Sequence, residues 1–248
     1  MDRAAFTAMT GAKYAVDLLS VTSNNLANAG TAGFREQLAF FRSVPLEGEG
    51  APTRTFAMGW TPFAKLSEGV MEPTGVPTNA AIDGPGWFVV LRRDGTQGLT
   101  RSGAFRVIEG KLCLSDGVPV VSAVGGSIAV PSGAEVDISD DGNVNAKFAT
   151  NPVTTQLLGR LKVVNPPKNT LLRDGDGFFV TLDKRVEQQV EDPTTKIRGR
   201  YLETSNVNSA NSLLQIIVDS RAFDMNMKVV QTVSENEKAA NSLVGRAR

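Results

Sequence analysis

The sequence predicts a mainly β central domain, antiparallel and irregular in the manner of a sandwich or barrel, flanked by an α-helix at each end of the chain. Near both ends, apolar residues recur at steps of three and four residues, which is the spacing of one helix face. Between about residues 80 and 190, short apolar runs alternate with turn residues roughly every 8–12 residues, a spacing typical of antiparallel β folds.

The composition favours an ordinary folded chain. It has 248 residues, 41% apolar and 21% charged, which suits one medium domain with appendages or two small domains. Lysine plus arginine and aspartate plus glutamate number 26 each, whereas nucleic-acid binders usually carry a basic excess. No apolar run reaches the roughly 18 residues of a membrane helix. We therefore expect neither a nucleic-acid partner nor a membrane span.

The absence of histidine restricts the possible chemistry. A chain without histidine has no Ser-His-Asp triad, Cys-His dyad or HExxH zinc site. A single cysteine, Cys113, excludes an intrachain disulfide and any CxxC site. We therefore expect a protein that is not an enzyme and that uses no cofactor or metal.

The first 35 residues predict an amphipathic helix that ends in a turn. Charged residues and Thr10-Gly11 interrupt the apolar stretch, so the segment does not read as a cleaved secretory signal. The helix can pack on its own domain or on another subunit, and its composition leaves both alternatives open. Its heptad seam consists of Ala5, Met9, Ala12, Val16, Leu19, Ser23 and Leu26.

Residues 206–248 predict a second, longer helix. From Asn208 to Val244 there is neither glycine nor proline, and about 36 helical residues span roughly 54 Å. Asn208 can cap the start and Gly245 can follow the end. One apolar stripe contains Leu214, Val218, Ala222, Met225, Val229, Val233, Asn236, Ala240 and Leu243, and an adjacent one contains Leu213, Ile216, Phe223, Met227 and Val230. The shorter first helix cannot cover both stripes, which predicts contacts with other subunits.

Between the helices, residues 36–79 predict an extended connector rich in proline and glycine, with room for a hairpin. Residues 80–205 predict the β domain, in which Glu109-Gly110 has the composition of a two-residue hairpin turn. The expected strands are Trp87–Leu91, Ala104–Ile108, Lys111–Leu114, Val118–Val121, Ser127–Val130, Val136–Ile138, Gln156–Val164, Phe178–Leu182 and Val186–Val190.

A few residues have patterns that could indicate a site. Asp174-Gly175-Asp176-Gly177 has the start of a calcium loop but lacks the later ligands, so a turn is favoured. Asp140-Asp141 could supply one member of a glycosidase carboxylate pair, although a solvated turn is the simpler interpretation. The asparagines near the helix ends either cap the helices or hydrogen bond between packed helices. They are Asn24, Asn25, Asn28, Asn206, Asn208 and Asn211.

Three motifs resemble those of the bacterial flagellar basal-body rod and hook proteins. The first is residues 23–28 followed by Thr31 and residues 33–35, with Ser23 where the family usually has alanine. The second is residues 81–88 with residues 94–96 and 100–105, although residues 78–79 depart from the usual pair just upstream. The third is residues 202–208, followed by Arg221-Ala222-Phe223-Asp224. The likeness covers essentially the whole chain.

The resemblance implies a structural subunit of the torque-transmitting rod, most similar to the proximal-rod members, with a distal-rod member as the alternative. It implies passage through the flagellar type III export apparatus without cleavage, a place in the periplasmic rod, and assembly with itself and other rod proteins through paired terminal helices. The residues expected to serve assembly are Met9, Val16, Leu19, Asn24, Asn25, Leu26, Asn28, Gly33, Phe34, Asn206, Asn208, Leu214, Val218, Met225, Val229, Val233, Ala240 and Leu243.

Two rival functions come from other classes. A carboxylate-dependent glycan hydrolase acting on the cell wall is supported only by the acidic turns and needs two carboxylates about 5–10 Å apart in a cleft. A secreted carbohydrate-binding or adhesin module accounts for the β domain but not for two long terminal helices.

Overall fold

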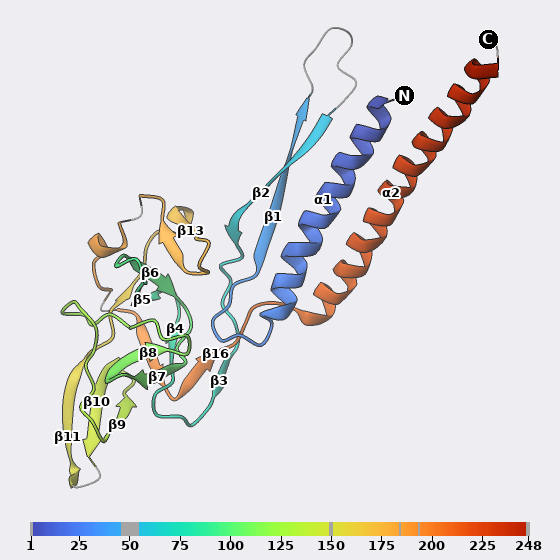
Figure 1. The fold of residues 1–248 in the computed structure, drawn as a ribbon. Helices are drawn as coiled ribbons and strands as arrows, with labels where there is room; N and C mark the ends of the chain where they lie inside the picture. Colours follow the sequence, from blue (N-terminus) through green and yellow to red (C-terminus); the bar gives the residue numbers. More distant parts are fainter. Residues whose placement is uncertain (1, 46–54, 149–150, 184, 193, 247–248) are drawn as a thin grey trace. The chain divides into compact units, whose positions relative to one another are not determined.

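The fold has a helix at each end of the chain and antiparallel β-structure between them, which confirms the predicted class (Figure 1). A computed structural model describes residues 2–45, 55–148, 151–183, 185–192 and 194–246. The contacts divide the chain into two compact units. The helical unit comprises Met1–Ala27, Gln37–Phe63 and Val207–Arg248, and the β unit comprises Asn28–Glu36 and Ala64–Asn206.

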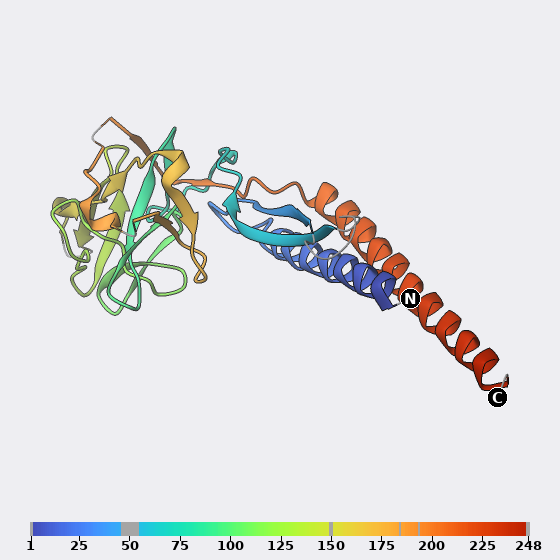
Figure 2. The ribbon, with the colours of Figure 1, turned by 90° about the horizontal axis from the view of Figure 1, so that it is seen from above.

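In the helical unit, α1 (Asp2–Ala27) and α2 (Ser209–Arg246) lie side by side and antiparallel. Gly11 lies against Asn226, whereas the later Thr22 hydrogen bonds to the earlier Asp219, which sets the opposite directions of the chains. The helices have 26 and 38 residues, so α2 extends past the start of α1 by roughly 18 Å at 1.5 Å per residue (Figure 2).

Sequence features account for the helix ends. The side chain of Asn208 accepts a hydrogen bond from the backbone N–H of Asn211 at 3.0 Å, which confirms its predicted role as the cap of α2. The predicted end at Val244, with Gly245 following it, is two residues short, because α2 includes Gly245 and Arg246. A single glycine costs a helix only about 1 kcal/mol, and terminal residues fray whatever their type.

The same unit contains a two-stranded sheet, formed by β1 (Gln37–Pro45) and β2 (Thr55–Ala64). Asn25 of α1 joins the start of this sheet, since its side chain both donates to the carbonyl oxygen of Gln37 and accepts from its N–H, at 2.9 and 2.8 Å. The strands fall within residues 36–79, where the sequence predicts an extended connector with room for a hairpin.

The β unit is an assembly of small sheets rather than one closed barrel. Its largest sheet has five strands in the order β12-β5-β6-β14-β13, beside a three-stranded sheet, β11-β10-β9, and the pairs β15-β4, β16-β3 and β7-β8. The strands are β3 (Met71–Pro73), β4 (Ala80–Asp83), β5 (Trp87–Leu91), β6 (Gln97–Thr100), β7 (Phe105–Ile108), β8 (Lys111–Leu114), β9 (Ala134–Ile138), β10 (Asn143–Phe148), β11 (Asn151–Arg160), β12 (Val163–Val164), β13 (Leu171–Arg173), β14 (Phe179–Thr181), β15 (Lys196–Gly199) and β16 (Tyr201–Glu203).

Several predicted strands differ from the observed ones. Val186–Val190 is not a strand, since Val186–Gln188 form a 3-10 helix whose single apolar anchor, Val186, is buried. The predicted run Gln156–Val164 divides into β11 and β12. Val118–Val121 and Ser127–Val130 pair only through isolated bridges. Short irregular segments can satisfy their backbone hydrogen bonds without forming regular strands.

Two buried clusters form the core of the β unit. One is centred on Phe88, Phe105 and Leu112, and the other joins Trp87 and Phe179, whose rings lie 4.6 Å apart. Trp87 and Phe179 begin β5 and β14, the strands on either side of β6. Both strands follow glycine turns of similar sequence, so similar turns deliver aromatic residues to one sheet.

The turn between β7 and β8 confirms the predicted hairpin. Ile108 pairs with Lys111, and the two residues between them, Glu109 and Gly110, have φ values of 51° and 71°. Two successive positive φ values define a type I′ turn, the geometry that matches the twist of paired strands.

We expect Asp137 of β9 to contribute to the acid sensitivity of the β unit. Burial raises the pKa of Asp137, but hydrogen bonds from Lys147, at 2.8 Å, and from Arg200, at 3.2 Å, outweigh it and hold the pKa below the ordinary value. A depressed carboxylate pKa stabilises the fold above the unfolded value of about 3.9, and this contribution disappears as the pH falls through the folded pKa.

Urea unfolding of Asp137→Asn between about pH 5 and pH 2 should therefore show a shallower fall in unfolding free energy than the original protein. Glu72→Gln is the control, because Glu72 is exposed on β3 and forms no ion pair within the described part of the chain. An unchanged slope for Asp137→Asn would contradict the assignment.

Candidate functional site

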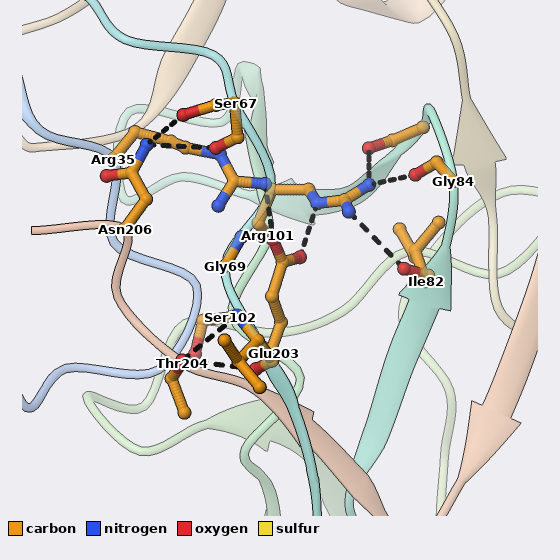
Figure 3. A network of polar contacts seen from close by, with 12 residues as sticks. Arg35, Ser67, Gly69, Ile82, Gly84, Arg101, Ser102, Glu203, Thr204 and Asn206 are labelled. Carbon is orange, nitrogen blue, oxygen red and sulfur yellow. Dashed lines mark hydrogen bonds and ion pairs between the residues drawn. The ribbon is translucent and has the colours of Figure 1, made fainter.

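The three family-like motifs meet at the carboxylate of Glu203, at the end of β16 (Figure 3). One carboxylate oxygen, Oε1, accepts hydrogen bonds from Arg35 Nη2 at 2.6 Å and from the N–H of Gly69 at 2.8 Å. The other oxygen, Oε2, accepts from Arg101 Nε at 2.7 Å. The side chains of all three charged residues are at most 3% exposed. One carboxylate thus joins segments more than 100 residues apart, and we call these residues the Arg35–Glu203–Arg101 cluster.

Arg101 extends the cluster into the second motif. Its Nη1 donates to the carbonyl oxygens of Gly84 and Gly86 at 2.8 and 2.7 Å, and its Nη2 donates to that of Ile82 at 3.3 Å. Gly84 and Gly86 have φ values of 96° and 148°, which favour glycine. The guanidinium therefore satisfies the carbonyl groups of Gly84 and Gly86, in the turn that leads into β5, and also reaches the end of β4 at Ile82.

Gly33 belongs to the cluster through its backbone. Its N–H donates to the carbonyl oxygen of Glu203 at 2.7 Å, and its φ of +69° lies in the left-handed region. A Cβ at this position would overlap the backbone of Arg101 and Ser102. Glycine is thus needed both for its φ and for the close approach of two chain segments.

Phe34 and Asn206 complete the junction. The Arg173 guanidinium lies 4.5 Å from the centre of the buried Phe34 ring, and burial lowers the pKa of Arg173. The Asn206 side chain donates to the carbonyl oxygens of Lys65 and Ser67 at 2.8 and 2.9 Å and accepts from the N–H of Glu36 at 2.7 Å. The hydrogen bonds of Asn206 stay within the β unit, so neither alternative from the sequence, helix capping or helix pairing, describes them.

The cluster carries more positive than negative charge. Two guanidinium groups share one carboxylate, and burial lowers the pKa of Arg35 although Glu203 raises it. Arg35 Nε and Nη1 have no hydrogen-bond partner among the described residues. A buried charge with incomplete pairing is costly, so the arrangement holds a specific junction at an energetic expense.

On α1, the residues expected to serve assembly are divided between exposed and partly buried positions. Met9 and Val16 are exposed, whereas Leu19 and Leu26 are half-buried. The buried face instead consists of small or polar side chains, namely Ala8, Ala12, Ala15, Thr22 and Asn25, of which only Ala12 belongs to the predicted seam. Asn25 bonds to the backbone of Gln37, as described above. The pattern of spacing was visible in the sequence, but the choice of face was not.

The other two asparagines near the end of α1 have different surroundings. Asn24 is exposed on α1. Asn28 follows the helix, and its side chain accepts a hydrogen bond from the Thr31 hydroxyl at 3.2 Å while its carbonyl oxygen accepts from the Thr31 N–H. Asn28 and Thr31 therefore form a local turn.

On α2, the large apolar residues of the predicted stripe face away from the buried seam. Leu214, Val218, Met225 and Val229 are exposed, Val233 and Ala240 are half-buried, and the side chain of Leu243 lies outside the described residues. Between the helices lie polar residues that the sequence analysis did not single out. Thr22 Oγ1 lies 3.3 Å from Oδ2 of the buried Asp219, and Gln215 donates to Asp219 Oδ1 at 2.8 Å.

The acidic turns are engaged in local structure. Asp174 and Asp176 form ion pairs with Arg92 at 2.9 and 2.5 Å, which occupies the oxygens that a cation would need. Asp140 is exposed and accepts a hydrogen bond from the N–H of Gly199 at 2.9 Å. Among the described residues, no three acidic or cysteine side chains gather in a metal-binding group. In the same part of the chain, neither helix has a segment apolar enough to cross a bilayer.

Comparison with known proteins identifies relatives over nearly the full length. Residues 81–146 match the flagellar hook protein FlgE/F/G D1 domain, and residues 198–243 match the C-terminal domain of the flagellar basal body rod FlgEFG proteins. The flagellar basal-body rod protein FlgF of Escherichia coli (strain K12) is 39% identical, over 98% of this chain and 99% of the relative. The chain belongs to the flagellar basal-body rod protein family.

Other relatives agree with this membership. FlgF of Salmonella typhimurium (strain LT2) is 38% identical over 98% of this chain and 99% of the relative, and FlgG of Agrobacterium fabrum (strain C58) is 30% identical over 94% and 96%. The resemblance inferred from the three motifs is thereby confirmed. Family members are structural rod proteins, and this chain is most similar to FlgF.

Gly33→Ala should destabilise this rod-family protein far more than Gly75→Ala. The two glycines have nearly equal φ values, +69° and +70°, but a Cβ on Gly75 would meet nothing within 4 Å. Gly75→Ala should cost about 1–2 kcal/mol for the left-handed backbone alone. Gly33→Ala should cost roughly a further 3 kcal/mol or more, because the new Cβ overlaps backbone. Urea unfolding measures both, and equal losses would contradict the close approach.

Glu203→Gln should reduce the unfolding free energy by about 3–5 kcal/mol, because it leaves two buried guanidinium groups without a countercharge. Glu36→Gln is the matched control. Glu36 pairs with Lys65 at 3.3 Å on the surface, and the loss of an exposed pair should cost at most about 1 kcal/mol. Similar losses of unfolding free energy for the two variants would show that the buried Glu203 carboxylate stabilises the fold no more than an exposed one.

Proposed function

We propose that the protein is a structural subunit of the proximal part of the flagellar basal-body rod, which polymerises through its terminal helices. The observation that carries the proposal is the distribution of side chains on α2. Polar residues such as Ser212 and Asp219 are buried, whereas large apolar residues are exposed. The exposed apolar residues are Leu213, Leu214, Ile217, Val218, Met225, Met227 and Val229.

This distribution is the reverse of that expected for a helix that packs only within its own chain. Soluble monomers rarely expose large contiguous apolar patches, and burial of one such side chain contributes about 1.5–3 kcal/mol. Neighbouring subunits that cover the α2 face would recover this free energy.

Polymerisation also requires an interface of the right symmetry. A face that binds a different face of the next subunit generates an open helical array, whereas a self-complementary face closes into a dimer. Among the described residues, α1 exposes the large apolar side chains Phe6, Met9 and Val16, so α1 and α2 present unlike apolar surfaces that could meet between subunits. A shaft built this way shares mechanical load over many helix contacts.

The relatives support the proximal assignment over the distal one. Identity is 39% to a FlgF protein and 30% to a FlgG protein. On this basis the partners are copies of this chain and other rod proteins, and the site of action is the periplasmic rod, reached through the flagellar type III export apparatus without a cleaved signal. The role is structural rather than catalytic.

Val229→Glu tests the proposed interface. Val229 is 48% exposed in the single chain, so the change should alter the monomer's unfolding free energy by no more than about 0.5 kcal/mol. In the rod, the carboxylate would be buried without a partner, at a cost of several kcal/mol per subunit. We therefore expect normal thermal unfolding and loss of motility.

Val124→Glu is the control, because Val124 is 96% exposed in the β unit and receives the same change of side chain. It should leave both unfolding and motility unchanged. If Val229→Glu cells swim normally, the α2 face is not an assembly surface. If Val229→Glu instead abolishes the monomer's melting transition, α2 belongs to the folded core of the single chain.

A further inference from the structure

The chain passes between the helical unit and the β unit four times. The crossings follow Ala27, Glu36, Phe63 and Asn206. The second crossing leads into β1, the third leaves β2, and the fourth leads into α2. The β unit therefore has to hold the roots of three elements of the helical unit, although these roots lie far apart in the sequence.

The side chain of Asn206 connects these three roots. Its Oδ1 accepts a hydrogen bond from the N–H of Glu36, the residue before β1, at 2.7 Å. Its Nδ2 donates to the carbonyl oxygens of Lys65 and Ser67, just after β2, at 2.8 and 2.9 Å, and lies 3.3 Å from the hydroxyl of Ser67 (Figure 3). Asn206 itself stands three residues before the start of α2 at Ser209.

Backbone hydrogen bonds join the same segments. The N–H of Asn206 donates to the carbonyl oxygen of Phe34 at 3.3 Å, and the N–H of Lys65 donates to that of Glu36 at 2.8 Å. All of these residues belong to the β unit. We call Phe34, Glu36, Lys65, Ser67 and Asn206 the Asn206 clamp.

The crossing between Glu36 and Gln37 has no free residue. Glu36 is held by Asn206 of the β unit. The next residue, Gln37, is held through both its N–H and its carbonyl oxygen by Asn25 of the helical unit. Domain boundaries usually fall in exposed, flexible linkers where few contacts are made. Here each unit fixes its own side of the crossing with an asparagine.

The chemistry of the clamp requires an amide at position 206. An asparagine side chain carries two N–H donors and a carbonyl acceptor in one plane. The contacts with Glu36, Lys65 and Ser67 use both the donor and the acceptor side of this group. Aspartate has the acceptors but no donor, and alanine has neither.

We propose that Asn206 is a positioning residue that holds the roots of β1, β2 and α2 together, so that these elements leave the β unit at a fixed mutual spacing. Neighbouring subunits that contact α2 and the β1-β2 sheet then meet both at a constant distance. The requirement of assembly for this spacing rests on the proposed function. The clamp itself does not depend on that function.

Hydrogen exchange of the full-length protein tests the clamp. In Asn206→Asp, a carboxylate replaces the amide opposite two carbonyl oxygens, so the side chain turns away and Glu36 N–H loses its acceptor. The exchange of Glu36 N–H, measured by NMR, should accelerate about two- to tenfold, the range for the loss of one hydrogen bond. Asn206→Ala should have the same effect. Acceleration in the aspartate variant alone would show that the new charge, rather than the lost amide, is responsible.

Asn169→Asp is the matched control for exchange. Asn169 is exposed in the 3-10 helix Lys168–Thr170 and belongs to none of the clamp contacts. Exchange of Glu36 N–H should be unchanged in this variant. Unchanged exchange in both Asn206 variants would overturn the clamp.

Urea unfolding separates positioning from general stability. Asn206 is only half-buried, so water can replace its hydrogen bonds when the side chain is changed. Asn206→Asp should therefore lose much less unfolding free energy than Glu203→Gln. A loss as large as that of Glu203→Gln would mean that Asn206 supports the whole β unit and has no separate positioning role.

Motility tests the need for fixed spacing. Asn206→Asp and Asn206→Ala cells should lose motility although the variant proteins fold, whereas Asn169→Asp cells should swim normally. If exchange accelerates but the Asn206 variants swim normally, assembly does not need the clamp, and the positioning role is overturned. If Val229→Glu also proves harmless, the proposed assembly through α2 fails, while the exchange result still decides whether the clamp exists.

Discussion

The β unit depends on one buried carboxylate. Glu203 holds two guanidinium groups and a backbone N–H, and each of these donors comes from a different part of the chain. A carboxylate can accept about four hydrogen bonds with no donor of its own, so it can join segments that would otherwise compete for partners. Small sheets with little regular pairing between them need such a junction, because their strands do not form one continuous ladder.

The cluster and the helices represent opposite solutions to the same requirement for specificity. In the β unit, charged groups are buried and their geometry allows only one arrangement of the three motifs. In the helical unit, small and polar residues lie between α1 and α2, with Thr22 beside Asp219, while large apolar residues stay exposed. Polar contacts between helices fix register, whereas apolar surface supplies association free energy that is not directional.

The sequence predicted the parts of the fold that periodicity and turn chemistry control. Both helices, β5 and β8, the Glu109-Gly110 turn and the Asn208 cap followed from local patterns. Val186–Val190 failed because an apolar run of five residues also suits a short helical turn with one buried anchor. The face of α1 that is buried could not be chosen, since the alanine and methionine stripes have equal periodicity.

The Glu203 junction was out of reach of local patterns for a different reason. Arg35 and Glu203 are separated by 168 residues, and a charged residue beside a strand is usually solvated. Only the resemblance pointed to the three motifs, and it assigned no physical role to Arg35, Arg101 or Glu203. The structure supplies that role.

The residues that carry the family resemblance lie mainly at close backbone approaches and around buried charges. Gly33, Arg101 and Glu203 should tolerate little change, because each is fixed by a close backbone approach or by a buried charge. The exposed face of α2 has looser requirements, since many apolar side chains provide similar burial. A recognisable motif is therefore expected around the Glu203 junction, whereas an assembly surface such as Leu214, Val218 and Val229 appears in the sequence only as a pattern of hydrophobicity.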